Sequence, residues 1–186
     1  MAKEIHEQPE VVGHTLTHFI DMVTGKVRLP AMEMIDWKAL PRLSITACGT
    51  AYLAGLTAKY WFERFARLPV EIDVASEFRY REAPLPDGGL MLVVSQSGET
   101  ADTLATLRYA KSQNNTILSI VNVPTSTIAR ESDAVAQTLA GPEIGVASTK
   151  AFTAQLAGLF LLTLALAQSK GRLSNDYSKA VIKKGV

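Results

Sequence analysis

The stretch Leu90-Met91-Leu92-Val93-Val94-Ser95-Gln96-Ser97-Gly98-Glu99-Thr100-Ala101-Asp102-Thr103 decides the fold. Its first five residues are an apolar run typical of a buried strand, and a helical pattern of apolar residues begins directly after it. The turn between them contains a glycine and the hydroxyls of Ser95, Ser97 and Thr100. Because the first N–H groups of a helix have no intrahelical partner and the helix dipole is positive there, this turn is a candidate anion site. The alternative is that Ser97 is only a helix cap and Gly98 only a turn residue.

The same strand-then-helix pattern recurs along the chain. Further strands are predicted at 43–47, 70–74, 116–121 and 134–139, with helices at about 51–67, 126–131 and 151–167 and the start of another at 175–184. Alternating strands and helices predict an α/β fold: a five-stranded parallel sheet with helices on both faces, in the flavodoxin-like order 2-1-3-4-5. In the strand at 70–74 charged residues alternate with apolar ones, which predicts an edge position.

Domain boundaries follow from the same pattern. Residues 1–42 are expected to form an amino-terminal helix, with Pro9 in its first turn and an apolar stripe to about Val23, followed by a connector. Residues 43–170 form the α/β domain, and 171–186 begin a linker or a further helix. In the connector, Met32, Met34, Trp37 and Leu40 indicate a packed segment. His14 and His18 have the spacing of a metal pair, but the further ligands are missing, so exposed or interfacial histidines are the better interpretation and no metal site is expected.

Charge and cysteine content exclude several classes of protein. A net charge of +1 gives no broad attraction for nucleic acid or for an anionic membrane, so neither is expected as a partner. The single cysteine, Cys48, excludes an intrachain disulfide and gives no sign of an oxidising compartment. The first nine residues are too polar for a secretory signal peptide, and we expect a cytoplasmic protein.

The segment 151–167 carries no charge, and a membrane helix has to be weighed for it. It is shorter than the roughly 20 apolar residues that span a bilayer, and it contains Thr153, Gln155 and Thr163. A helix that is apolar nearly all round is also typical of a protein core or an oligomer interface, and we favour that interpretation.

Topology brings three turns to one edge of the predicted sheet. Ligands of doubly wound sheets bind beyond the carboxyl ends of the strands, at the point where the strand order reverses. The turns there are Cys48-Gly49-Thr50, residues 95–98 and residues 144–149, all of them small and hydroxyl-bearing. The usual cradles for nucleotides, G-x-x-x-x-G-K-[ST] and G-x-G-x-x-G, are absent from the sequence, so a phosphate monoester on a small molecule is predicted. Lys150 is either a cation for this site or a solvated charge, and Glu99 should point away from a phosphate.

Several stretches resemble the sugar isomerase (SIS) domain of the glutamine–fructose-6-phosphate aminotransferase family. They are residues 95–103 (SQSGETADT), 75–81 (ASEFRYR) and 143–153 (EIGVASTKAFT), together with Lys3-Glu4-Ile5, Glu7-Gln8-Pro9 and Cys48-Gly49-Thr50. The resemblance runs from Lys3 to about Ala167 and is to the first of the family's two SIS subdomains.

This resemblance implies an enzyme that converts fructose 6-phosphate and glutamine to glucosamine 6-phosphate and glutamate. It implies that a glutaminase domain and a second SIS subdomain complete the protein, and that no cofactor is needed. In the family the acid–base residues lie in the second subdomain and the carboxyl-terminal tail, so no catalytic residue is expected here and the chain should bind without turnover. The implied sugar-phosphate-binding residues are Cys48, Gly49, Thr50, Ser95, Gln96, Ser97, Thr100, Val146 and Ser148. Family members usually have serine where this chain has Ala51.

Two other classes of function stay open at this point. The chain could be a stand-alone SIS isomerase or amino-sugar deaminase that completes its site across a homodimer. It could also be a sensor that binds sugar phosphates without chemistry. The apolar segment 151–167 and the amino-terminal helix favour a homodimer in either case.

Overall fold

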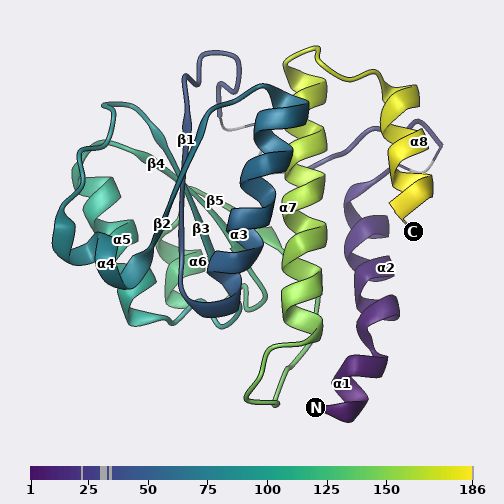
Figure 1. Cartoon of the computed structure of the whole chain (residues 1–186), viewed down its shortest axis with the longest axis horizontal. Coiled ribbons are helices and arrows are strands. Elements are labelled where there is room, and N and C mark those ends of the chain that lie inside the picture. The colour runs from purple at the N-terminus through teal and green to yellow at the C-terminus, as the bar shows by residue number, and fades with distance from the viewer. Residues whose placement is uncertain (22, 30–32, 34, 186) are drawn as a thin grey trace.

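Five parallel strands form one sheet in the order β2-β1-β3-β4-β5 (Figure 1). The computed structural model describes residues 1–21, 23–29, 33 and 35–185. The strands are β1 (Leu43–Ala47), β2 (Val70–Val74), β3 (Leu90–Ser95), β4 (Thr116–Val121) and β5 (Ala134–Gln137). The predicted α/β class, the parallel sheet, the flavodoxin-like order and the edge position of residues 70–74 are therefore confirmed.

Strand β3 occupies the centre of the sheet because it is apolar on both sides. Side chains alternate between the two faces of a strand. Leu90, Leu92 and Val94 accordingly belong to one buried cluster, while Met91 and Val93 belong to a second. A strand that is buried on both faces has a continuous run of apolar residues, and residues 90–94 form such a run.

Helices cover both faces of the sheet (Figure 1). On one face lie α3 (Gly49–Trp61), the π-helical turn η2 (Phe62–Ala66) and α7 (Lys150–Ser169), and on the other lie α4 (Ala75–Arg81), α5 (Ala101–Ser112) and α6 (Thr127–Glu131). The amino-terminal helices α1 (Ala2–His6) and α2 (Gln8–Phe19) lie beyond α7, and α2 packs against it. Helix α8 (Asn175–Gly185) ends the described chain.

Helix α7 has the length and apolar composition of a membrane-spanning helix. However, 67% of its apolar window is buried inside the chain. It packs between the sheet, α3 and α2, with Leu159, Leu162 and Leu166 almost completely buried. This packing favours the core-helix interpretation over the membrane one.

Several predicted boundaries were wrong. The first helix ends at Phe19 rather than near Val23, because Ile20 is extended and forms an isolated β-bridge with Val27. The helix predicted at 51–67 begins at Gly49 and continues as the π-helical turn, after which Arg67 adopts a left-handed φ of 51°. The fifth strand ends two residues early, since Leu139 also has a positive φ. Helix α4 was not predicted at all.

The connector is packed, as expected from its apolar residues. Trp37 and Leu40 are buried in the core, whereas Met32 and Met34 lie outside the described residues. His14 and His18 are exposed on α2. Within the described part of the chain, no group of three or more His, Cys, Asp or Glu side chains could hold a metal ion.

Candidate functional site

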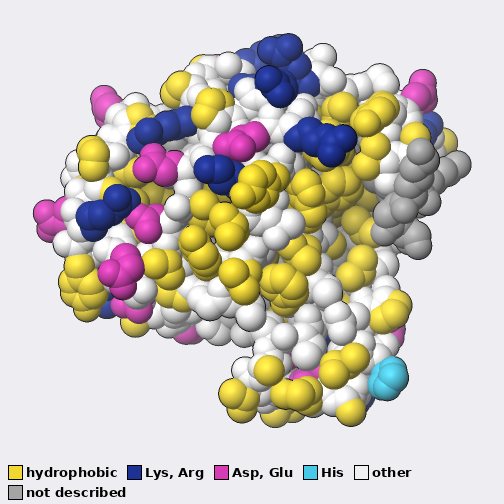
Figure 2. Space-filling model, viewed as in Figure 1, with side chains coloured by type: hydrophobic (Ala, Val, Ile, Leu, Met, Phe, Trp, Pro, Cys, Tyr) yellow, Lys and Arg dark blue, Asp and Glu magenta, His cyan; other side chains and the backbone are white. Residues whose placement is uncertain are grey.

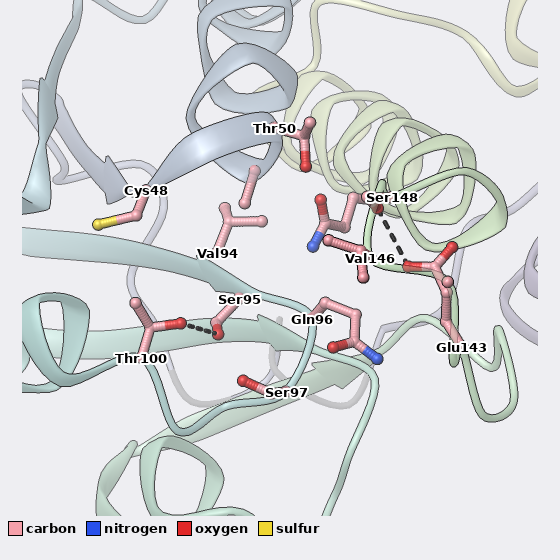
Figure 3. Close-up of a pocket in the computed structure, with 13 residues that line it drawn as sticks. Cys48, Thr50, Val94, Ser95, Gln96, Ser97, Thr100, Glu143, Val146 and Ser148 are labelled. Atoms are coloured by element: carbon pink, nitrogen blue, oxygen red, sulfur yellow. Dashed lines mark hydrogen bonds between the residues drawn. The ribbon is translucent and has the colours of Figure 1, made fainter.

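An open pocket of about 220 Å³ lies at the carboxyl ends of β1 and β3 (Figure 3). Register explains its position: Ala47 pairs with Val94, so the chain leaves both strands at the same level. Eight of the nine predicted site residues line the pocket, namely Cys48, Thr50, Ser95, Gln96, Ser97, Thr100, Val146 and Ser148. The ninth, Gly49, lies between two of them in the chain. The structure thus brings together turns that are up to 100 residues apart in the sequence.

In the turn after β3, side-chain hydroxyls form hydrogen bonds with the backbone N–H groups and with each other. The Ser95 hydroxyl accepts the Gly98 N–H at 3.0 Å and lies 3.2 Å from the Thr100 hydroxyl oxygen (Figure 3). The Ser97 hydroxyl accepts the Glu99 N–H at 3.2 Å. The alternative of Ser97 as only the helix cap was wrong, because α5 begins at Ala101 and its N-cap position is Thr100, three residues after Ser97.

Glu99 points away from the pocket, as expected for a carboxylate next to a phosphate site. Its carboxylate accepts the Thr127 N–H at 2.7 Å, at the first residue of α6. This hydrogen bond is the main reason that the pKa of Glu99 lies below its ordinary value. The negative charge therefore stabilises the start of α6 and leaves the turn at 95–98 neutral.

The start of α3 offers the clearest anion-binding geometry. Its N-cap residue, Cys48, makes no side-chain cap hydrogen bond, and the first helical N–H with a backbone partner is that of Tyr52. The N–H groups of the first turn are thus open toward the pocket. The Thr50 hydroxyl points into the pocket, whereas the Cys48 thiol points toward α5 and accepts a 3.7 Å hydrogen bond from Thr103 (Figure 3). Cys48 can therefore contribute its backbone to a ligand, but its thiol is turned away.

The third turn, residues 144–149, differs from the other two, because the start of the helix that follows it is already capped. Glu143 caps the start of α7: one carboxylate oxygen accepts the N–H groups of Thr149 and Ala151 at 2.9 and 3.1 Å. The other oxygen accepts the Ser148 hydroxyl at 3.1 Å (Figure 3). A protein carboxylate thus takes the place that an anion would occupy at α7. Val146 is fully exposed at the pocket mouth and is free to contact a ligand.

Lys150 is neither a solvated charge nor a cation in the pocket. Its side chain is 7% exposed, and its ammonium donates to the Glu7 carboxylate at 2.7 Å. A buried lysine needs such a partner, because burial without one would favour the neutral amine. The sequence could not predict this pair, since 143 positions separate its members.

Five lining residues were not predicted: Ala51, Val94, Glu143, Gly145 and Gln155. Gln155 is the most informative of them, because it is 2% exposed and its Oε1 atom has no hydrogen-bond partner in the described part of the chain. A buried acceptor without a partner is costly, and this one lies in the pocket wall. The signal available in the sequence was an amide inside an otherwise apolar helix.

Comparisons with known proteins identify the family of the chain. The profile of the SIS domain family matches residues 37–165. The glutamine–fructose-6-phosphate aminotransferase (isomerizing) of Bradyrhizobium diazoefficiens is 66% identical over 95% of this chain and 29% of that protein. The solved carboxyl-terminal domain of glucosamine–fructose-6-phosphate aminotransferase from Francisella tularensis is 44% identical, with a TM-score of 0.91 over 98% of this chain and 51% of that one.

A glucosamine-6-phosphate deaminase from Thermotoga maritima is a more distant structural match, 25% identical with a TM-score of 0.74 over 96% of this chain and 51% of that one. The chain spans about 30% of the length of the curated relatives that it matches.

Proposed function

This chain belongs to the SIS domain family, and from that premise we propose that it is the sugar-phosphate-binding part of a glutamine–fructose-6-phosphate aminotransferase. The complete enzyme would make glucosamine 6-phosphate and glutamate from fructose 6-phosphate and glutamine. In this proposal the turn at 95–100 and the start of α3 bind the phosphate, and residues 146–148 line the sugar.

One observation carries the proposal: the pocket presents hydroxyls and uncapped backbone N–H groups without any charged donor. Thr50, Ser97 and Thr100 are hydroxyl donors at a point where two helices begin. Among the described residues that line the pocket there is no lysine, arginine or histidine. Hydroxyls and backbone N–H groups at the starts of helices suit a phosphate monoester, whose charge is stabilised by helix dipoles and hydrogen bonds.

The polar groups at the sugar end of the pocket, near residues 146–148, are of the kind that bind a polyhydroxyl ligand. Its polar groups are the Ser148 hydroxyl and the buried amide of Gln155, which lacks a partner for Oε1. A hydroxyl of a bound sugar is the kind of donor that would satisfy this oxygen. A volume of about 220 Å³ also suits a small metabolite.

Binding without turnover is the expected behaviour of this chain. Opening the sugar ring and moving a proton between C1 and C2 need a positioned acid–base group. Glu143 is the one carboxylate among the described residues of the pocket, and both of its oxygens already accept hydrogen bonds from the start of α7. We therefore assign Glu143 a structural role and place the proton chemistry in parts of the enzyme that this chain does not contain.

Calorimetric titration with fructose 6-phosphate tests the proposal. We expect saturable binding, weaker binding of inorganic phosphate, and much weaker binding of fructose, which lacks the phosphate. A companion assay with fructose 6-phosphate and ammonia should give no sustained glucosamine 6-phosphate. Absence of binding would overturn the proposal, and sustained product would overturn the assignment of chemistry to other parts.

Ala51 offers a gain-of-affinity prediction. It lies in the first turn of α3, lines the pocket and occupies the position where the family usually has serine. We expect Ala51→Ser to strengthen fructose 6-phosphate binding by about two- to tenfold, since a net hydrogen bond contributes about 0.5–1.5 kcal/mol. The ratio of the two dissociation constants measures the effect. An unchanged or weaker affinity would show that the added hydroxyl does not reach the ligand.

Amino-sugar deamination is the second candidate function, because the chain also matches a structure named as a glucosamine-6-phosphate deaminase. The higher identity to the aminotransferases makes it the weaker candidate. Release of ammonia from glucosamine 6-phosphate by this chain would favour deamination, and binding without release would favour the aminotransferase part or a non-catalytic sensor.

We also propose a cytoplasmic location and a homodimer. Helix α7 buries most of its apolar residues inside the chain, so only its partly exposed residues are left for a partner surface. Hydrophobic side chains gather over α3 and α7 in Figure 2, among them the exposed Leu53 and Tyr60 and the partly buried Trp61 and Phe160. Light scattering at micromolar concentration should give twice the monomer mass, and a monomeric mass would contradict the homodimer.

A further inference from the structure

We propose that helix α1 and Glu7, the residue that follows it, form a strap that positions the sugar-lining loop 143–149, with Glu4 and Glu7 as its positioning residues. The inference rests on the proposed function, because it takes this loop to contact the sugar. Figure 1 shows the loop between β5 and α7 extending beside α1, at the end of the molecule where the chain begins.

Glu4 makes the central contacts of this strap. One of its carboxylate oxygens accepts the N–H groups of Ile144 and Gly145, at 2.6 and 3.0 Å. The Glu4 side chain is 9% exposed, so it is enclosed between α1 and the loop. The Met1 ammonium, 2.8 Å away, and the two N–H groups lower the pKa of Glu4 to about 2. The carboxylate is therefore ionised at neutral pH and remains a strong acceptor for the loop.

Gly145 shows how closely the strap and the loop approach each other. A Cβ atom built on Gly145 would lie 2.6 Å from Glu4 Oε2, closer than real Cβ contacts. The backbone of Gly145 is not in the left-handed region, so Glu4 is the main obstacle to a side chain there. A glycine at this position lets the loop lie directly on the carboxylate.

Glu7 provides the second attachment. It accepts the buried ammonium of Lys150, the first residue of α7, at 2.7 Å. Thr149 and Ala151, on either side of Lys150, are held from the loop side by Glu143. The strap thus contacts both ends of the sugar-lining segment: Glu4 near its start and Glu7 at the point where α7 begins.

The loop needs these polar contacts because it has little apolar packing of its own. Ile144 is 89% exposed and Val146 is fully exposed. Hydrophobic burial therefore does not hold residues 144–146 in place, whereas the turn at 95–98 follows directly from the buried strand β3. Loss of the strap should change the sugar end of the pocket and leave the phosphate end as it is.

A pair of titrations with Glu4→Ala tests this separation. We expect the variant to bind fructose 6-phosphate about fivefold or more weakly, within the usual range of coupling between sites. Its affinity for inorganic phosphate, measured by NMR titration, should stay unchanged. The amides of Ile144 and Gly145 should exchange faster with solvent, because their acceptor is gone. Glu10→Ala, on the exposed face of α2, is the matched control and should behave as the parent chain.

Gly145→Ala disturbs the same contact from the side of the loop. It is the test variant to use if Glu4→Ala fails to fold. Alone it should weaken fructose 6-phosphate binding, because its Cβ displaces the loop from Glu4. In a Glu4→Ala background the same substitution should have little further effect, so the double-mutant cycle should show coupling.

The outcomes separate the two proposals. If the parent chain binds no fructose 6-phosphate, the proposed function fails and the strap fails with it. If the parent chain binds but Glu4→Ala and Gly145→Ala bind equally well, the strap alone is overturned. Equal weakening of fructose 6-phosphate and inorganic phosphate would also overturn it, since that pattern indicates general disturbance of the pocket.

Discussion

Replacing Thr50 by valine and Ser97 by alanine in one chain is expected to weaken fructose 6-phosphate binding by at least about 100-fold. Each substitution removes a hydroxyl that lines the phosphate end of the pocket. A hydrogen bond to a charged group contributes about 1.5–3 kcal/mol, so two of them account for about 3–6 kcal/mol, and each 1.4 kcal/mol is a factor of about ten in affinity. Calorimetric titration of the double variant gives the ratio directly.

The fold should survive this change. Thr50 is exposed and makes no side-chain hydrogen bond within the described residues, and the Ser97 hydroxyl accepts only the N–H of the exposed Glu99. The matched control is Thr57→Val with Ser112→Ala, which removes one exposed hydroxyl from α3 and one from α5, both away from the pocket. If control and test variants bind alike, the phosphate does not lie on these hydroxyls.

The sheet could be predicted from the sequence because its signal is local. The apolar runs at 43–47, 90–94 and 116–121 are each short, bounded by turn residues and followed by a helix. Right-handed crossovers and a reversal of strand order then bring the turns after β1 and β3 together. Six of the eight predicted residues that line the pocket come from these two turns, and the other two come from the loop before α7. That they bind a sugar phosphate is still a prediction.

Contacts between distant segments could not be predicted in this way. The sequence alone suggests a surface charge at Lys150, because its partner Glu7 lies between α1 and α2, far away in the chain. Helix α4 is short, and part of its stability comes from Phe78, which packs against Tyr109 of α5. Glu143 could not be predicted either, because it lies eight residues before the predicted helix at 151–167, outside the first turn where an acidic residue is expected.

Gly98→Ala is expected to lower the stability of the fold strongly, because it affects both the backbone conformation and the packing of the turn after β3. Gly98 has φ +67°, which costs other residues about 1–2 kcal/mol. An added Cβ would also lie 2.0 Å from Ser126 Oγ and 2.4 Å from Ser126 Cβ, and forced overpacking costs about 1–3 kcal/mol. Together these effects predict a loss of about 2–5 kcal/mol. A chain of this size loses about 2–4 °C in Tm per kcal/mol, so calorimetry should show a fall of about 5–15 °C or more.

Two further variants separate the backbone effect from the overlap. Gly88→Ala places a side chain at a similar φ of +66° but in open space, so it should cost only the backbone part. Adding Ser126→Gly to Gly98→Ala removes the atoms that the new Cβ meets, at a cost of only a few tenths of a kcal/mol for the lost cap of α6. This double variant should regain the part of the free energy of unfolding that is lost through the overlap with Ser126, and it should be about as stable as Gly88→Ala. If Gly98→Ala alone is no less stable than Gly88→Ala, the close approach between the turn after β3 and the start of α6 does not limit the residue at position 98.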